Sequence, residues 1–551
     1  MLKKLFVLLL AVCLCLSVFA CGGNETEKKY DDKDSTRAED EEDKKDSSED
    51  KNTNGEISIG GEMSFVDDVE DTSEEASDTV SSSENEGESG AYADLLPEAV
   101  DMGGRKFNIL QRWFGYGKPT IDFQGEVIWE DSENGDMTSI NLAKKKVLDE
   151  VQKKYNCTVT GEMSTKTAGE IRTMLQDDIL AGTAEYDFCF ETYYYYYAFA
   201  EDGLLTDLND LGIDFSQAWW DQNAVEDLSV CGKLYYALGD INTYDNDGTS
   251  VLFFNKDLYE RKGGDVQALY DMALAGDWTF EEFKNIVTGF GADLNADGKR
   301  DKSDLYGLLT ERSNLYNHLL ASGGRAVEKD DNDEPYYALL NKENYDVFVA
   351  ATNLYLNSND VFICDLDVYT MPYDGYNPHE SNINAFKEGR GLFYMTSLIK
   401  FPCFSDMNDE FGVLPIPKYS TEQDRYYHHM LSFASSVLFV PNGENSRGEK
   451  GEELGVLLDA LGAYSKDYVT PAYYEKLLKR GEHTDTHSGA VLENCILNSR
   501  RFDLGQVFDG RWMTADVIDA FESSWNNLFE ERLEDIEENI ASTVEKIKEN
   551  G

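Results

Sequence analysis

The 551-residue chain has little of what common catalytic and metal motifs require. It contains six histidines, and neither H-E-x-x-H nor G-x-S-x-G occurs. No two of its nine cysteines are spaced as C-x-x-C, so no dithiol or zinc motif is present. These absences argue against an enzyme, although among 107 carboxylates a glycosidase pair is not excluded by counting.

Basic residues are also scarce. Lysine and arginine total 49 against 107 aspartates and glutamates, and the formal net charge is −58. A chain this acidic is poorly suited to bind nucleic acid, whose phosphates repel it. The charge is better explained as keeping an exported protein soluble.

The first residues predict export. Lys3 and Lys4 precede a short apolar run, which ends at Ala20 and Cys21. This pattern is typical of a secretory signal, and a cysteine after a small residue resembles the lipobox of bacterial lipoproteins. The resemblance predicts a lipoprotein signal peptide over residues 1–20 and a diacylated Cys21 that anchors the chain to the outer face of the bacterial cell membrane. The alternative is an ordinary signal with an incidental cysteine.

Residues 21–95 have a different composition from the rest. Between residues 22 and 90 there are 25 acidic and 7 basic side chains and almost nothing apolar. Such a segment cannot offset its ordering entropy, so a disordered, extended linker is predicted. An acidic tail that binds a basic partner is the other interpretation.

The remaining residues are long enough for two or more lobes and follow an α/β pattern. Strands are predicted at 107–110, 157–160 and 186–190, and helices at 140–155 and 171–179. This alternation indicates parallel strands with crossover helices. No Gly-rich phosphate motif follows the strands, so no organic cofactor is expected.

Two helices are marked further along the chain. Thr279 and Glu282 have the spacing of a capping box, and Trp278 and Phe283 that of a hydrophobic staple. Apolar residues between 525 and 547 recur at helical spacing, which is typical of core packing.

Six ordered segments support a family resemblance. They are Gly203–Leu208, Trp219–Asn223, Gly232–Tyr236, Val251–Tyr259, Trp278–Phe283 and Phe411–Lys418. In this order they resemble the extracellular solute-binding proteins of ABC importers, family 1, which often carry sugars.

The resemblance implies an α/β, two-lobed periplasmic-binding-protein-like fold of type 2, each lobe a mixed sheet flanked by helices. Lobe 1 is expected to contain residues 100–250 and 413–485, and lobe 2 residues 251–412 and 486–551. Hinge positions are expected near Val251–Phe254 and Val413–Pro417.

The implied function is that of a monomeric, non-enzymatic protein that captures a small solute, most plausibly a carbohydrate or oligosaccharide, and delivers it to an ABC transporter permease. A surface glycan-binding module and a hydrolytic lipoprotein are the alternatives.

One loop has the pattern of a calcium site. Residues 293–304 place oxygen donors at loop positions 1, 3, 5, 9 and 12 and glycine at position 6. Its last position is Asp, as in dockerin-type loops. The predicted ligands of a structural Ca²⁺ are Asp293, Asn295, Asp297, Lys299, Asp301 and Asp304. An acidic turn without metal is the alternative.

The solute site is predicted where strands end or the chain changes lobes, because α/β sheets bind ligands at the carboxyl ends of their strands. Sugar sites combine flat aromatic rings with polar side chains. The candidates are Trp113, Phe114, Tyr193, Tyr194, Trp220, Tyr244, Asp245, Tyr394 and Thr396. For each aromatic residue, core packing is an equally good interpretation.

Six cysteines follow Cys21, and several lie in apolar, strand-like runs. Buried free thiols are therefore expected, while disulfide pairing stays open because spacing alone does not determine it.

Overall fold

The computed structural model describes residues 90–112, 125–129, 137–192, 197–367, 378–431, 435–479, 486–508 and 532–550. The predicted signal peptide, Cys21 and nearly all of the predicted linker lie outside the described residues. Within these ranges, no helix combines the length and apolar character needed to cross a membrane.

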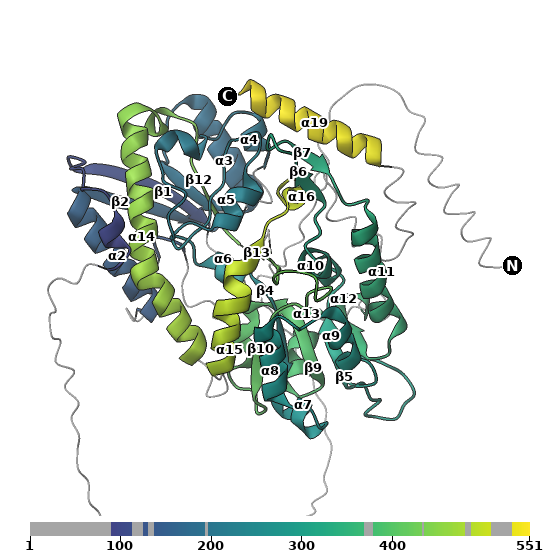
Figure 1. Ribbon diagram of the computed structural model, residues 1–551. Helices are drawn as coiled ribbons and strands as arrows, with labels where there is room; N and C mark the ends of the chain where they lie inside the picture. The colour runs from purple at the N-terminus through teal and green to yellow at the C-terminus, as the bar shows by residue number, and fades with distance from the viewer. Residues whose placement is uncertain are drawn as a thin grey trace, which may run out of the picture. The chain divides into compact units, whose positions relative to one another are not determined.

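The first lobe is built on a four-stranded sheet in the order β12-β3-β1-β2 (Figure 1). Its strands are β1 (Arg105–Arg112), β2 (Cys157–Ser164), β3 (Phe188–Glu191) and β12 (Val437–Phe439). β1 pairs in parallel with β2 and β3, as the sequence predicted, and β12 joins β3 in the antiparallel direction. The sheet is therefore mixed.

The second lobe contains a five-stranded sheet in the order β10-β4-β9-β5-β8. Its strands are β4 (Ser250–Asn255), β5 (Tyr306–Thr310), β8 (Val361–Ile363), β9 (Gly391–Ser397) and β10 (Phe411–Leu414). β4 is antiparallel to both of its neighbours, whereas β5 is parallel to β8 and β9. Two mixed sheets confirm the predicted fold class.

Helices flank both sheets. Those of the first lobe are α2 (Ser139–Tyr155), α3 (Ala168–Ala181), α4 (Tyr197–Glu201), α5 (Gln222–Leu228) and α14 (Gly448–Lys479). The second lobe has α7 (Lys256–Arg261), α8 (Val266–Ala275), α9 (Phe280–Val287), α10 (Asn314–Ala321), α11 (Lys342–Asn357), α12 (Cys364–Asp367), α13 (Pro378–Lys387) and α15 (Thr486–Val491). α14 packs along α2 (Figure 1).

Local signals explain where several helices begin. Thr167 and Glu170 form a reciprocal capping box at the start of α3. At α9, the side chain of Thr279 accepts the backbone N–H of Glu282, as predicted. The rings of Trp278 and Phe283 meet edge to face with centroids 6.0 Å apart, which confirms the predicted apolar contact.

The body begins before the predicted end of the linker. Residues 93–95 form a short 3-10 helix, and Ala93 is buried. The backbone N–H groups of Tyr92 and Ala93 donate to the carboxylate of Asp467 on α14. The last residues assigned to the linker therefore contact the body, because their backbone groups find partners on α14.

The C-terminal helix α19 (Leu533–Glu549) covers the later part of the predicted 525–547 stripe. Ile536, Ile540 and Ile547 are buried on its inner face, so this part of the stripe is core, as expected. The helix packs against α4 and β7 (Pro335–Tyr337), the second strand of a hairpin with β6 (Val327–Lys329) (Figure 1).

The chain passes between the sheets just before the first predicted hinge stretch and at the end of the second, because residues 415–417 follow β10. Residues 251–254 lie inside β4 and residues 413–414 inside β10, where Val413 pairs with Phe253. The connections themselves are residues 242–249 before β4 and the segment from β10 to β12. That segment includes β11 (His428–His429), which pairs in parallel with β13 (Arg500–Arg501).

Candidate functional site

The carboxyl ends of the two sheets meet at one place. In the first sheet, Glu191 ends β3 and pairs with Val437, where the antiparallel β12 begins. In the second, Ser397 ends β9 and pairs with Ser250, where the antiparallel β4 begins. The residues preceding β4 and β12 therefore lie at the carboxyl edges, where α/β sheets bind ligands.

These two connecting segments contact each other. The Leu431 N–H donates to the carbonyl of Gly248 at 3.0 Å, and the Asn242 amide donates to the carbonyl of Ser436 at 3.1 Å. We call residues 242–249, 430–431 and 435–436 the crossing junction. It joins the carboxyl edges of both sheets.

Glu126 holds the crossing junction from the first lobe. Its carboxylate accepts the backbone N–H groups of Thr243 at 2.6 Å and Tyr244 at 3.2 Å, and the hydroxyl of Ser436. Burial raises the pKa of Glu126 to about 7, against the opposing effect of the Lys144 ammonium. Both carboxylate oxygens are thus used to position backbone.

Glu191 lies at the same edge without such partners. Its side chain is 0% exposed, and neither carboxylate oxygen has a hydrogen-bond partner among the described residues. Burial raises its pKa to about 8, and the guanidinium of Arg112, at the end of neighbouring β1, and the backbone N–H of Thr192 oppose that rise. The hydroxyls of Thr192 and Thr243 are likewise buried without a described partner. Each unsatisfied buried oxygen calls for an explanation, and a ligand that binds there is one.

Polar side chains also lie at the carboxyl edge of the second sheet, but they bind one another or the backbone. Arg312, two residues after β5, forms an ion pair with Asp365 at 2.9 Å. The Asn314 amide donates to the carbonyl of Met395 at 2.8 Å, and the Asn382 amide to that of Thr310 at 3.0 Å.

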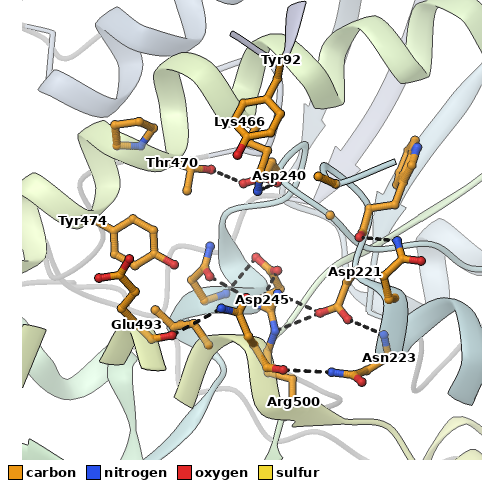
Figure 2. A pocket seen from close by; sticks show the side chains of 18 of the residues that line it. Tyr92, Asp221, Asn223, Asp240, Asp245, Lys466, Thr470, Tyr474, Glu493 and Arg500 are labelled. Carbon is orange, nitrogen blue, oxygen red and sulfur yellow. Dashed lines mark hydrogen bonds and ion pairs between the residues drawn. The ribbon is translucent and has the colours of Figure 1, made fainter. Parts of the chain in front are cut away.

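A pocket opens along one side of the crossing junction, which contributes Asp245 and Asn246 to its wall (Figure 2). It has a volume of about 1240 Å³ and is lined from α5, α14, the residues around α6 (Tyr244–Asp247), and the segment 489–500. We call it the Arg500 pocket. The side chains that decide its character are Trp220, Asp221, Asp240, Asp245, Lys466 and Arg500.

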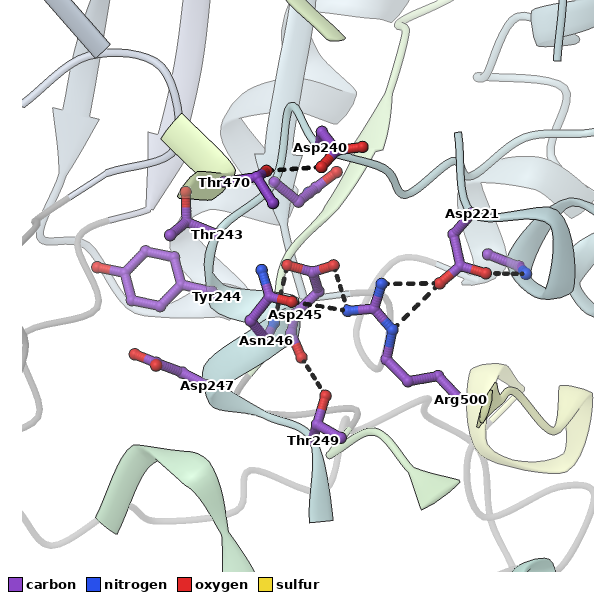
Figure 3. A network of polar contacts seen from close by, with 12 residues as sticks. Asp221, Asp240, Thr243, Tyr244, Asp245, Asn246, Asp247, Thr249, Thr470 and Arg500 are labelled. Atoms are coloured by element: carbon purple, nitrogen blue, oxygen red, sulfur yellow. Dashed lines mark hydrogen bonds and ion pairs between the residues drawn. The ribbon is translucent and has the colours of Figure 1, made fainter. Parts of the chain in front are cut away.

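Ion pairs dominate the walls of the Arg500 pocket. The guanidinium of Arg500 points between Asp221 and Asp245, at 2.9 and 2.6 Å (Figure 3). Burial alone would lower the pKa of Arg500, but Asp245 and Asp221 outweigh it and raise that pKa. Asp240 accepts from Lys466 at 3.0 Å. Asp221 also caps α5, so the pairs tie secondary structure elements together.

Of the nine predicted solute residues, the five that the structure describes do not form one group. Trp113, Phe114, Tyr193 and Tyr194 lie outside the described residues. Trp220 and Asp245 line the Arg500 pocket, next to the buried Tyr244. Tyr394 and Thr396 belong to β9 of the second sheet.

Two of these aromatic residues pack as core. Trp220 is 2% exposed, packs on Phe215, and donates its indole N–H to Asp459 at 2.8 Å. Tyr394 is fully buried beside Phe386 and Phe404. Glu126, Glu191 and Arg500 were not among the candidates predicted from the sequence. Of the three, Glu191 could have been chosen, because it lies just after a predicted strand.

The predicted calcium loop folds on its own backbone. Asp293 accepts the N–H groups of Ala296 and Gly298 at 2.7 and 2.9 Å, and buried Asp304 accepts that of Leu294 at 3.0 Å. Throughout the described ranges, no three His, Cys, Asp or Glu side chains are grouped closely enough to hold a metal ion. Calcium binding by Asp293, Asn295, Asp297, Lys299, Asp301 and Asp304 stays a prediction.

The six described cysteines are free thiols, as expected. Cys157, Cys189, Cys364 and Cys495 are buried, and burial raises the pKa of each. They are therefore weak nucleophiles at neutral pH.

No family model matches the chain, and no curated protein matches it. Solved structures with a similar fold include an ABC substrate-binding protein from Listeria monocytogenes in complex with cycloalternan. It is 15% identical, with 80% of this chain and 99% of that chain covered and a TM-score of 0.47. The maltose-binding protein MalE of the same organism, in complex with maltose, is 12% identical over 80% and 98% of the chains, with a TM-score of 0.46.

An ABC transporter solute-binding protein from Thermotoga lettingae, bound with α-D-tagatose, is 14% identical over 80% and 100% of the chains, with a TM-score of 0.45. These structures are of the class that the sequence predicted. Their low identities and TM-scores carry neither a ligand nor a function over to this chain.

Proposed function

We propose that this protein is an extracellular, lipid-anchored solute-binding protein that captures a carbohydrate between its lobes and delivers it to an ABC transporter permease. One observation carries the proposal. The carboxyl edges of two separate sheets converge on the crossing junction, and buried oxygens of Glu191, Thr192 and Thr243 have no described partner there. A polyhydroxylated solute offers many hydrogen-bond donors to such oxygens.

The connections between the sheets suit reversible capture. Closure about a hinge would bring the two edges together over a solute and present a closed form to the permease. The crossing junction is the place where such a hinge would act, because the chain runs through it on the way from one sheet to the other.

A hydrolase is the main competing function, and the geometry does not favour it. Glycosidases need two free carboxyl groups on either side of the scissile bond. At the crossing junction Glu126 is committed to two backbone N–H groups and the Ser436 hydroxyl, so it is unavailable as an acid or a nucleophile. Asp245 is paired with Arg500 and Asp247 accepts the hydroxyl of Tyr473, so among the described residues of the junction Glu191 has no free carboxyl group to act with.

A thermal-shift screen against sugars, polyols and peptides tests the proposal. A bound solute raises the melting temperature by mass action. At a free concentration of 100 times its Kd, the solute adds about 2.7 kcal/mol to the free energy of unfolding. The solute should be recovered unchanged after prolonged incubation. Consumption of the solute would establish the hydrolase, and binding of peptides alone would refute the carbohydrate assignment.

Lipid anchoring is tested separately at Cys21. Substituting Cys21→Ser removes the sulfur that would carry the acyl chains, so the protein should appear in the medium or stay unprocessed. Unchanged membrane retention of this variant would contradict the anchor while leaving solute binding untouched.

A further inference from the structure

Glu191 differs from every other buried carboxylate in the described part of the chain. That part contains nine buried Asp or Glu side chains: Glu126, Asp178, Asp187, Glu191, Glu201, Asp227, Asp245, Asp304 and Asp503. Eight of them accept hydrogen bonds, for example Asp227 from Arg325 at 2.6 Å and Glu201 from Thr543 at 2.5 Å. Among the described residues, neither oxygen of Glu191 has a well-aligned partner, and only the adjacent backbone N–H of Thr192 acts on it.

The neighbourhood of Glu191 does not compensate its charge. Arg112, at the end of the adjacent strand, attracts the carboxylate but makes no hydrogen bond to it. The remaining effect of burial still raises the pKa of Glu191 to about 8. Glu191 therefore keeps its proton near neutral pH, and an ammonium group brought beside it would stabilise the ionised form instead.

The surrounding charge favours the same kind of ligand. Beyond residue 90 the chain carries a formal net charge of −42. A field of this sign concentrates cations near the protein and raises their association rate.

We propose that the solute is an amino sugar, or an oligosaccharide that contains one, and that its protonated amine pairs with the carboxylate of Glu191. The inference rests on the proposed function, because it specifies the carbohydrate that the crossing junction would hold. A charge-assisted hydrogen bond in a water-poor site is about twice as strong as a neutral one, so Glu191 would determine specificity as well as affinity.

Matched sugar pairs test this inference by calorimetric titration of the full chain. Each pair differs at one position, with an ammonium group in one member and a hydroxyl in the other. The pairs are glucosamine and glucose, galactosamine and galactose, and mannosamine and mannose, each as the monosaccharide and as a trisaccharide in which only the terminal sugar is changed. We expect at least one amino member to bind ten-fold or more tightly than its neutral partner.

The substitution Glu191→Gln keeps the shape of the side chain and removes its charge. It should abolish the preference for the amino member, so that the two members of each pair bind within about two-fold of one another. Glu185→Gln is the matched control, because Glu185 is exposed and lies only six residues away. It should retain the wild-type preference. Circular dichroism and melting curves establish that both variants fold.

The outcomes separate this inference from the proposed function. If neutral sugars bind as tightly as their amino partners, or if Glu191→Gln keeps the preference, the amino-sugar inference is overturned and the protein is still a carbohydrate binder. If no sugar of either kind binds, the proposed function fails and the inference fails with it.

Discussion

The Arg500 pocket and the Glu191 edge both contain buried charge, but they handle it in opposite ways. In the Arg500 pocket, one guanidinium lies between the carboxylates of Asp221 and Asp245. At the sheet edge, the carboxylate of Glu191 has no described hydrogen-bond partner. A buried ion pair stabilises the fold, because removing one partner leaves the other charge buried alone. A buried group without a partner destabilises the fold, and a ligand that pairs with it removes that penalty. The comparison separates a region that holds elements together from one that is suited to binding.

The largest expected effect follows from breaking the paired region. Arg500→Met replaces the guanidinium with an apolar side chain and leaves Asp221 and Asp245 buried without their cation. We expect a loss of roughly 3–5 kcal/mol in the free energy of unfolding, measured by urea denaturation. Lys145→Met is the control, because its ion pair with Asp149 is exposed and contributes little. A loss in Arg500→Met no larger than that of the control would show that the pocket wall is not structural.

The next effect concerns the unpaired region and depends on pH. The folded pKa of Glu191, about 8, lies above its value in the unfolded chain, near 4.5. The native state therefore binds the proton more tightly, and this stabilising contribution is full below pH 4.5 and is lost as pH rises to about 8. Relative to Glu191→Gln, the wild type should lose stability across that range, with a slope of at most about 1.4 kcal/mol per pH unit.

Denaturation at pH 5, 6, 7 and 8 measures this difference. Glu126 titrates in the same range but is present in both proteins, so its contribution cancels. Glu185→Gln should run parallel to the wild type, since its carboxylate is exposed. If the difference in the free energy of unfolding between wild type and Glu191→Gln stays constant with pH, the charge of Glu191 is neutralised by a partner in solution.

Sequence patterns predicted the scaffold better than the site. Parallel β1, β2 and β3 followed from alternating strand and helix signals, because periodicity is a local property that each segment carries by itself. The start of α9 followed from Thr279 and Trp278 for the same reason. These features depend on residues that are close in the chain.

The site depended on residues that are far apart in the chain. Arg500 meets Asp221 across 279 positions and Asp245 across 255, and no sequence spacing indicates such a pair. Aromatic character also did not distinguish the solute site from the core. Tyr394 could pack in a core or stack on a sugar, and in the structure it is buried in the core. Glu191 was visible as a strand end, but its lack of partners is a property of the folded chain.

The acidic loop at residues 293–304 offers a third way to handle charge. Its carboxylates already accept hydrogen bonds from backbone N–H groups. We therefore expect a bound calcium ion to stabilise the fold less than the Arg500 ion pairs do. We expect the melting temperature to fall by a few degrees when chelator replaces calcium. The double substitution of Asp293→Ala and Asp297→Ala should remove that dependence. Superimposable wild-type curves in chelator and calcium would show an ordinary turn.

The smallest effect is expected from the acidic linker. Deleting residues 26–89 removes many charges but, by its composition, no core contacts, so the melting temperature and solute affinity should stay nearly unchanged. The deletion ends before Tyr92 and Ala93, whose backbone N–H groups donate hydrogen bonds to Asp467. A drop of several degrees would mean that the linker packs on the body.

The most direct test of the central claim is a crystal structure of the protein grown with the sugar that binds most tightly in the calorimetric panel. Density for the sugar is expected at the carboxyl edges of the two sheets, with one of its polar groups within hydrogen-bond distance of the Glu191 carboxylate. Density in the Arg500 pocket with Glu191 uncontacted would contradict it, because the paired region would then be the binding site.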